Sequence, residues 1–477
     1  MALPQRIAAI PSYIPKELKD TAPGHRFQLY LEHWQGQNGN TFTPYKKARP
    51  QGKDERTLFD RECAGVLKDL CLLPPSSLDA LKGIRTRQQT LLAHYGSSGY
   101  RISATSTAPF ATGLGNEHPI ENGFAFLTPY GLPYLAGSGV KGILRRAAEE
   151  LALQNETQQP GDWTWLAVWC LFGFEGAVDK GSLWDATSTL GQAFLRDLSK
   201  TAVQPDLYAL IRTLFAGSKE GARFLDTENQ GTEQFLRACM AGKSLRGGLQ
   251  CRGALDFWDV FPNPAGGKLV VEIMTPHYSK YYQGEETPHD SGAPIPVSFL
   301  AVPARSQFDF HAICHPSRLP ESLKNQWRVL LDRAFRHAFE WVGFGAKTSV
   351  GYGAMEKDLA AQKRHEEAHQ AAQDAARKDQ EKRSREEANS RLSPAMRAAQ
   401  EFFEARVDTN QSELSTLFGG LKKGVWSSDT KFEIAQYVRQ LMIKDKKWKE
   451  KSEKKNPAKD NDHQDTLMVM KCLGSGK

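Results

Sequence analysis

The chain has 477 residues, of which 40% are apolar and 25% charged, a balance typical of a soluble globular protein with two to four domains. Its formal net charge of +7 at pH 7 is compatible with a polyanionic partner without requiring one. The seven cysteines include no C-x-x-C pair, which argues against a disulfide framework or a cysteine zinc site and predicts a reducing, cytoplasmic location. The longest uncharged apolar run, at 163–174, is too short to span a bilayer and is expected as a buried core helix or strand.

The first three quarters of the chain mix strand and helix patterns. Residues 1–99 form an N-terminal segment with a predicted strand at 25–34 and a helical stretch around 54–95, part of the core or packed on it. Residues 100–357 are the predicted core, with a helical insertion at about 154–250. Its predicted strands are 270–274, 297–302 and 308–313. Because helices separate the strands without a regular βαβ period, the fold class expected is α+β.

The composition changes sharply after residue 357. Residues 358–391 carry eight acids and eight bases with no sustained apolar stripe, which predicts a charged helical linker over 358–392. Apolar residues then recur at helical spacing over 393–443, which predicts a small helical domain. Residues 444–477 are interpreted as a basic tail, with eight lysines against three acids in 444–459. Two functions of this tail are compatible with the sequence: contact with nucleic acid, and an increase in the solubility of the protein.

The stretch 128–153 carries the strongest local signal. An amphipathic helix is predicted to start near Gly139, with Ser138 as its N-cap and with Lys141 and Arg145 one turn apart on the same face. Free N–H groups and two cations would make an anion site there. Residues 137–142 also match G-x-G-x-x-G, but no acidic residue follows at the distance that binds a ribose. A capped helix with merely solvated bases is the structural alternative.

A second glycine-rich stretch, GFGAKTSVGYGAM at 343–355, surrounds Lys347, Thr348 and Ser349. It follows a predicted amphipathic helix at 323–342 whose buried side includes Trp341. A Walker phosphate loop would need glycine in place of Ala346 and a strand in place of the helix. The remaining readings are a glycine loop that lies against a polyanion and a tight turn.

Other polar groups point to chemistry more weakly. The loop 113–126 contains Asn116 and His118, which suit a general acid/base pair or a ligand contact, although such residues often satisfy their own turn. The H-E-x-x-H match at 365–369 lies in the charged linker, and the histidines of HAICH at 311–315 lack a fourth ligand. No metal or cofactor is expected.

Motifs in a fixed order resemble those of a known family. They are PFATGLGNEHPIENG (109–123), GLPYLAGSGVKGILR (131–145), CLFG (170–173), GALDFWDVFP (253–262), TPHYSKYY (275–282) with PIPVSFLAV (294–302), and GFGAKTSVGYG (343–353). Together they resemble the RAMP superfamily of CRISPR-associated proteins. Within it the chain is most similar to the family of the sixth RAMP subunit of the Cmr complex, the type III-B RNA-targeting effector.

The resemblance implies a ferredoxin-like, RRM-related core and a non-catalytic subunit that binds guide RNA and its RNA target beside other RAMP subunits, with no membrane partner. It matches the start of the predicted helix to the family's guide-backbone contact and the second glycine loop to a neighbouring surface. The family's usual motif at this helix start is G-S-S, whereas this chain has Gly139 at the third position. The implied RNA-binding residues are Gly137, Ser138, Gly139, Lys141, Arg145, Gly343, Gly345, Lys347, Thr348, Ser349 and Gly351.

A second group is expected to contact RNA or a neighbouring subunit. It comprises Asn116, His118, His277, Tyr278, Tyr281 and Tyr282, the last four in the aromatic stretch 275–296. Two alternatives remain. One is an endoribonuclease, as some RAMP relatives are, with Asp290, His118 or His277 as candidates. The other is sequence-independent binding of single strands outside any CRISPR system, which leaves the ordered motifs unexplained.

Overall fold

The computed structural model divides the chain into two compact units, residues 1–363 and 364–477. It describes residues 7–11, 18, 20–37, 41–44, 63–154, 162–175, 185, 187–200, 250–275, 284, 287, 296–406, 408–452 and 456–474. Within these ranges helices and strands are mixed in the first unit, and the second unit is helical. The α+β class predicted for the core is confirmed.

A four-stranded antiparallel sheet organises the first unit. Its strands are β3 (Gly99–Ser106), β8 (Leu255–Phe257), β11 (Gln307–Cys314) and β12 (Met355–Lys357), in the spatial order β12-β3-β11-β8. Helix α4 (Gly137–Gln154) lies between β3 and β8 in the chain, and α13 (Trp327–His337) lies between β11 and β12. The core elements therefore follow one another as β-α-β-β-α-β.

One face of the sheet is apolar and packs against α13. Ile102 and Phe310 are opposite each other in the register of β3 and β11, and both are buried. The ring of Phe310 lies 5.3 Å from that of Phe335 on α13 and 4.8 Å from that of Phe344, between centroids. Alternation along the two strands sends these residues to the same side, so the main core forms between the sheet and α13.

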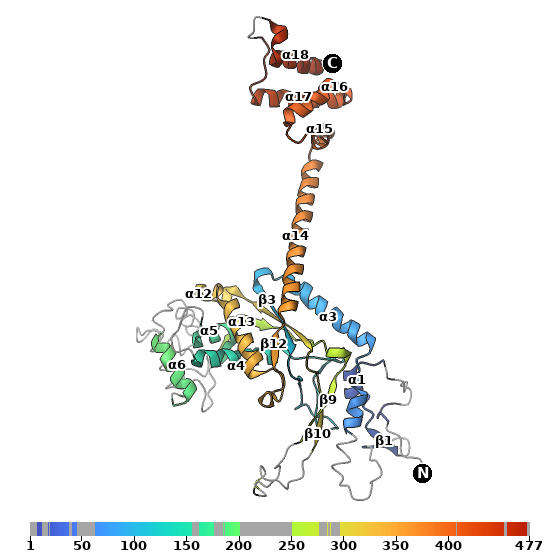
Figure 1. Ribbon diagram of the computed structural model, residues 1–477, viewed down its shortest axis with the longest axis vertical. Helices are drawn as coiled ribbons and strands as arrows, with labels where there is room; N and C mark the ends of the chain where they lie inside the picture. The colour runs from blue at the N-terminus through green and yellow to red at the C-terminus, as the bar shows by residue number, and fades with distance from the viewer. Residues whose placement is uncertain are drawn as a thin grey trace. The chain divides into compact units, whose positions relative to one another are not determined.

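The opposite face of the sheet is polar and is covered by α3 (Pro75–Ala93), so that α3 and α13 lie on opposite sides of it (Figure 1). Asp309 on β11 pairs with Arg85 of α3 at 2.7 Å and with Arg101 of β3 at 3.0 Å, and it accepts a hydrogen bond from Ser103. Although burial raises the pKa of Asp309, the two arginines hold it well below its usual range. This ion network attaches α3 to the sheet.

Further short elements surround the sheet. β9 (Val270–Met274) and β10 (Val297–Ala301) confirm the strands predicted at 270–274 and 297–302, and they pair antiparallel. The apolar run 163–174 contains α5 (Trp165–Phe172), which is buried along its whole length, so the predicted core helix is confirmed. The remaining elements are β1 (Trp34–Gln37), β2 (Thr41–Pro44), β4 (Phe126–Leu127), β5 (Leu132–Pro133), β6 (Gly173–Glu175), α6 (Thr189–Lys200), β7 (Gln250–Arg252) and α12 (Glu321–Lys324).

Two local predictions are wrong. In the segment predicted as a strand at 25–34, the first four residues belong to helix α1 (Pro23–Gln28) and only Trp34 lies in a strand. The helix forms because Pro23 suits the first helical position and Phe27 is buried in the core. Trp341, predicted on the buried side of a helix, is 77% exposed. Regular helix ends at His337, and the π turn η5 (Ala338–Val342) follows, so the residues after it leave the 3.6-residue period.

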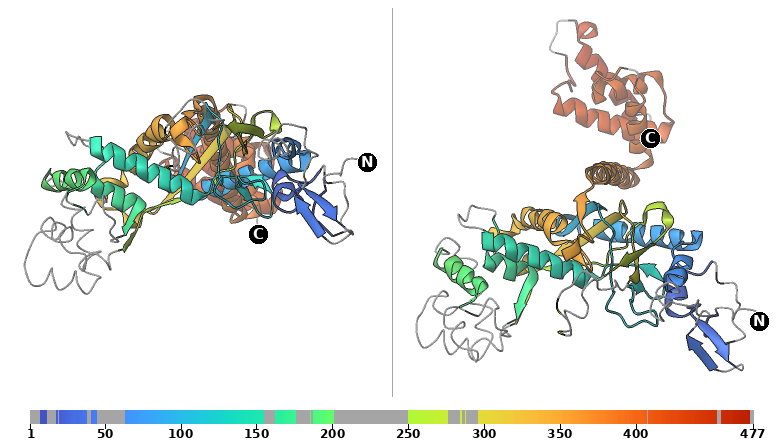
Figure 2. Two further views of the ribbon diagram at one scale, coloured as in Figure 1. Left: turned by 90° about the horizontal axis from the view of Figure 1, so that it is seen from below. Right: turned by 60° about the horizontal axis from the view of Figure 1, so that its bottom comes forward.

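The second unit is a bundle of short helices. The long helix α14 (Leu359–Ser390) leads into it, as the charge pattern predicted. Within the bundle, which is orange to red in Figure 2, α17 (Ser428–Lys444) packs against three other helices, α15 (Pro394–Glu404), α16 (Glu413–Lys423) and α18 (Asn461–Gly474). Its separate hydrophobic core includes Leu417, Ile434, Val438 and Val469. Val469 belongs to the segment interpreted from sequence as a basic tail. That segment therefore supplies α18 to the bundle.

In the described part of the chain, no helix is long and apolar enough to cross a membrane.

Replacing Asp309 by Asn should lower the free energy of unfolding by about 3 kcal/mol at pH 7, because two half-buried arginines lose their buried anion. The folded-state pKa of Asp309 is depressed, so its stabilisation is complete above the unfolded pKa of about 4 and is lost as pH falls below that value. Denaturant unfolding from pH 7 to pH 3 measures both effects. Glu321→Gln, which removes an exposed pair with Lys324, is the control; equal losses in both variants would contradict the assignment.

Candidate nucleic-acid interface

Helix α4 begins where its first residue meets strand β8. The Gly137 N–H donates a hydrogen bond to Asp259 Oδ1 at 2.7 Å, and a Cβ on Gly137 would collide with the carbonyl oxygen of Phe257. The helix therefore starts at Gly137 and is capped by the carboxylate of Asp259. Ser138, predicted as the N-cap, is instead an exposed residue of the first turn.

A cluster of basic side chains lies around Asp256, next to this helix start. Asp256 Oδ2 is 2.8 Å from His315 Nε2 and 3.1 Å from Arg252 Nη2. Lys141 interacts electrostatically with Asp256, Arg252 and Arg145. Lys141 and Arg145, both predicted from the sequence, therefore lie near Asp256 and Arg252, which were not. We call Lys141, Arg145, Arg252 and His315 the Lys141 cluster.

The charges of the Lys141 cluster are only partly compensated. Although burial raises the pKa of Asp256, its hydrogen bonds with His315 and Arg252 bring the pKa below the ordinary value, so the carboxylate is ionised. Arg145 pairs with Glu149 of the same helix at 2.9 Å. Lys141 is half-buried, and burial lowers its pKa while Asp256 raises it. Within the described ranges its ammonium group has neither a hydrogen bond nor an ion pair, so an anion placed there would gain from a partly desolvated cation.

The second glycine-rich stretch is shaped by its own packing. Gly345 and Gly353 have φ of 88° and 73°, and a Cβ on either would collide with backbone, of Ala111 and Phe344 respectively. Ala346 forms an antiparallel bridge with Ala111. Gly343 and Gly351 also have positive φ. The glycines thus allow a tight turn to lie against the segment 109–111, which accounts for their number without a ligand.

The polar residues of this loop have different surroundings. Lys347 has a left-handed backbone with φ of 60°, and its Nζ lies 3.4 Å from Met274 Sδ and 5.3 Å from the ring centroid of Phe299. Its side chain therefore rests on the β9–β10 pair. Thr348 is half-buried and Ser349 is exposed. The contacts of the loop run to β9, β10 and residues 109–111, whereas those of the Lys141 cluster run to β8.

His118 has a structural environment. Its ring stacks on Phe27 with 3.7 Å between centroids, and Nε2 lies 2.9 Å from the Phe27 carbonyl oxygen. Since a carbonyl only accepts, Nε2 carries the proton, and Nδ1 accepts from the Ile120 N–H at 3.5 Å. Burial lowers the pKa of His118, which favours this neutral form. Asn116 is exposed in the same loop.

The remaining candidates are the residues of the stretch 275–296 and the possible metal ligands. His277, Tyr278, Tyr281 and Tyr282 lie outside the described residues, as does Asp290. Among the residues that are described, no cluster of His, Cys, Asp or Glu has the arrangement of a metal site. The two histidines of HAICH diverge: His311 is buried beside Trp258, whereas His315 pairs with Asp256.

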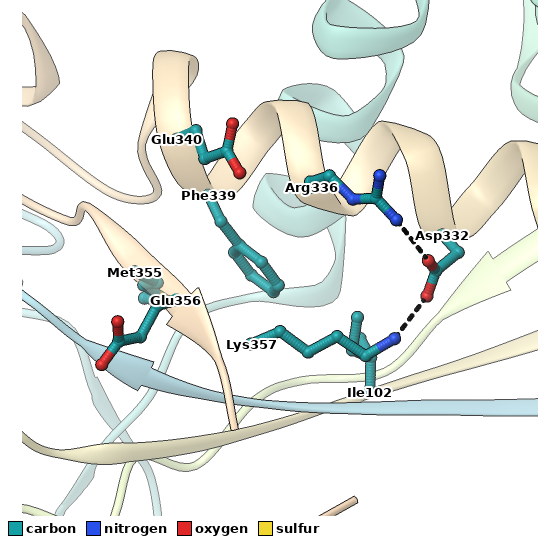
Figure 3. Close-up of a pocket in the computed structure, with 8 residues that line it drawn as sticks. All are labelled: Ile102, Asp332, Arg336, Phe339, Glu340, Met355, Glu356 and Lys357. Carbon is teal, nitrogen blue, oxygen red and sulfur yellow. Dashed lines mark hydrogen bonds and ion pairs between the residues drawn. The ribbon is translucent and has the colours of Figure 1, made fainter. Parts of the chain in front are cut away.

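A small cavity opens between α13 and the edge strand β12 (Figure 3). Its volume of about 170 Å³ is below the range of typical ligand pockets. Asp332 on its wall already pairs with Lys357 at 2.9 Å and with Arg336 at 3.6 Å. None of the predicted site residues lines it, so the Lys141 cluster is the stronger candidate site.

Sequence reasoning missed the part of the cluster that comes from outside α4. Arg252, Asp256 and His315 belong to β7, β8 and the residue after β11, which are distant in sequence from Lys141. The only available signal was GALDFWDVFP, whose two aspartates are Asp256 and Asp259. Their pairing with the helix start depends on tertiary structure, which no local pattern encodes.

Replacing Gly137 by Ala should lower the free energy of unfolding by about 1–3 kcal/mol, because the new Cβ forces α4 away from β8. Gly142→Ala is the matched control on the same helix, since nothing lies within 4 Å of a Cβ there. It should stabilise the chain by about 0.5–1 kcal/mol through helix propensity. Chemical denaturation measures both variants, and a neutral Gly137→Ala would refute the close approach.

Comparison with known proteins relates this fold to a family. The RAMP superfamily profile matches residues 103–356, from β3 to β12. The CRISPR system Cmr subunit Cmr6 of Pyrococcus furiosus is 28% identical over 256 residues, which are 51% of this chain and 63% of that protein. The chain thus matches less than two thirds of the length of this curated relative.

Two solved structures are also similar. One is the Type III-B Cmr-beta bound to cognate target RNA, with 15% identity, a TM-score of 0.31, and coverage of 65% of this chain and 76% of that chain. The other is Cmr6 from Pyrococcus furiosus, with 21% identity, a TM-score of 0.25, and coverage of 54% and 97%. Since the family profile spans more than half of the residues and reaches all four strands of the sheet, the chain belongs to the RAMP superfamily.

Proposed function

We propose that this protein is a guide-RNA-binding subunit of a type III-B CRISPR ribonucleoprotein that targets foreign RNA in antiviral defence. Membership of the RAMP superfamily and the similarity to Cmr6 support the assignment to such a complex. The observation that carries RNA binding is the Lys141 cluster, in which a half-buried ammonium group has no hydrogen-bonded or ion-paired anion within the described residues. A phosphate of the RNA backbone would supply that anion.

The chemistry of the cluster suits backbone contact more than base reading. Lysine and arginine side chains bind phosphate oxygens irrespective of the base attached. Ser138 is exposed in the first turn of α4 and adds a hydroxyl donor beside Lys141. A subunit that carries guides of arbitrary sequence requires this kind of contact.

The core is proposed to be ferredoxin-like. The β-α-β-β-α-β order and the spatial order β12-β3-β11-β8 support this. RRM domains stack bases on the open face of such a sheet. In this chain α3 and the Asp309 ion network cover that face, which supports RNA binding at the start of α4 and at the second glycine loop instead.

The remaining partners follow from the same proposal. Other RAMP subunits of the Cmr complex would flank this one, and the target RNA would pair with the guide. A reducing, cytoplasmic location belongs to the same proposal, and Cys71, Cys314 and Cys472, which form no disulfide, support it.

We further propose that the subunit is non-catalytic. Of the candidates for cleavage, His118 uses both ring nitrogens within the fold, which supports a structural role for it. An endoribonuclease acting through Asp290 or His277 is the competing function, and both residues lie outside the described ranges.

Lys141→Ala and Arg252→Ala should each weaken binding of single-stranded RNA and reduce the slope of log affinity against log salt by about 0.7, because each removes one phosphate contact. Lys347→Ala tests the glycine loop in the same titration, with the same expected reduction. Arg146→Ala is the control, since Arg146 is exposed on α4 and already pairs with Glu150. If Lys141→Ala and Arg252→Ala match the control, the interface is misplaced.

RNA that copurifies with the complex should be short and should share a repeat-derived end, and sequencing it tests guide binding directly. Heterogeneous cellular RNA would instead indicate a general single-strand binder. Target cleavage by the reconstituted complex should survive Asp290→Ala and His277→Ala. Loss of cleavage in either variant, with RNA binding intact, would establish the catalytic alternative.

A further inference from the structure

The second unit lies outside the family match, which ends at residue 356, so the proposed function leaves it unassigned. Its most distinctive surface feature is a concentration of lysines at the ends of α16 and α17. Helices α16 and α17 pack against each other and against α18, and Lys422 and Lys447 both lie near enough to Asp465 of α18 to act on it electrostatically. The lysine surface, as we call it, consists of Lys422, Lys423, Lys444, Lys446, Lys447 and Lys451.

The segment after α17 is held in a defined conformation. The Lys449 N–H donates to Thr466 Oγ1 at 3.0 Å, and the Lys449 carbonyl oxygen lies 2.9 Å from His463 Nδ1. Ser452 donates to Asp460, whose side chain is buried. The lysines on either side of these contacts are therefore presented from an ordered backbone. Preorganised charges lose less conformational entropy when they bind.

The six lysines are exposed, and their ammonium groups form no ion pair within the described part of the unit. Asp445 and Glu450 lie among these lysines in the sequence, and Asp462 and Asp465 lie on α18. Glu450 accepts a hydrogen bond from Trp448, and burial, the largest influence, raises the pKa of Asp465 despite its lysine neighbours. Lys449 and Arg439 add two further cations, so the surface keeps a net positive charge.

Stabilisation of helix ends explains only part of this set. Lys422, Lys423 and Lys444 lie in the last turns of α16 and α17, where a cation is favourable. Lys446, Lys447 and Lys451 follow the end of α17, beyond the turn in which the helix dipole acts. Their concentration there is unexplained by the fold and fits a polyanion.

We propose that the lysine surface of the second unit is a second contact for the phosphate backbone of single-stranded RNA, independent of base sequence. The choice of RNA as occupant rests on the proposed function, whereas the surface itself is separate from the Lys141 cluster. Electrostatic contact of this kind adds affinity through counterion release without selecting a sequence.

The test uses the full chain with Lys446, Lys447 and Lys451 replaced together by Ala. Affinity for a single-stranded RNA is titrated against salt, and the slope should fall by about 2, or about 0.7 for each lysine. The same three positions replaced by Arg should keep the slope. Lys68, Lys82 and Lys268, which are exposed in the first unit, are replaced by Ala as a control of equal charge, with no change expected.

The outcomes separate this inference from the proposed function. If the triple Ala variant loses slope while Lys141→Ala does not, the lysine surface stands and the Lys141 cluster is misplaced. If only Lys141→Ala loses slope, the lysine surface is refuted. Equal losses in the triple variant and its control would also refute it, since net charge alone would then explain the effect. Binding to vesicles of anionic phospholipid that is lost with the triple variant, without an effect on RNA, would assign the surface to a membrane instead.

Discussion

The approach of Gly137 to the backbone of β8 determines where the candidate interface lies. Only a residue without a side chain fits against the carbonyl of Phe257, and the Asp259 carboxylate then caps the helix that starts there. With its start held on β8, α4 carries Lys141 to Asp256 and its basic partners. Strand β8 thus supplies Asp256, the counter-charge of the cluster, and the segment directly after it supplies Asp259, the cap of the helix, so position and electrostatics are coupled.

The other side of the sheet shows how the fold restricts where a ligand can bind. A carboxylate between two arginines is costly to bury, and Asp309 is tolerated because Arg85, Arg101 and Ser103 all satisfy it. This arrangement commits the polar face to contact with α3. The edges of the sheet, where helices begin and loops end, remain open to a ligand. Helix α4 begins at such an edge.

Sequence patterns predicted what local periodicity controls. The buried helix at 163–174, the strands of the β9–β10 pair, the long charged helix and the start of an amphipathic helix near Gly139 all follow from spacing and composition. Predictions failed where a distant residue decides the outcome. Phe27 is held in a helix by burial against the core, and Asp259 replaces Ser138 as the cap. Half of the Lys141 cluster was missed for the same reason, since β7, β8 and β11 bring it together. Trp341 failed for a different reason, because a π turn breaks the helical period and leaves it exposed.

The contrast between two glycines of α4 has a practical side. Gly137 is enclosed by backbone, but Gly142 is exposed, and open space surrounds the position of its missing side chain. It is also the residue next to Lys141, on the helix that carries the candidate interface. A cysteine introduced there would give a fluorophore or spin label a site that reports on ligand binding at the candidate interface while leaving the packing of the helix intact.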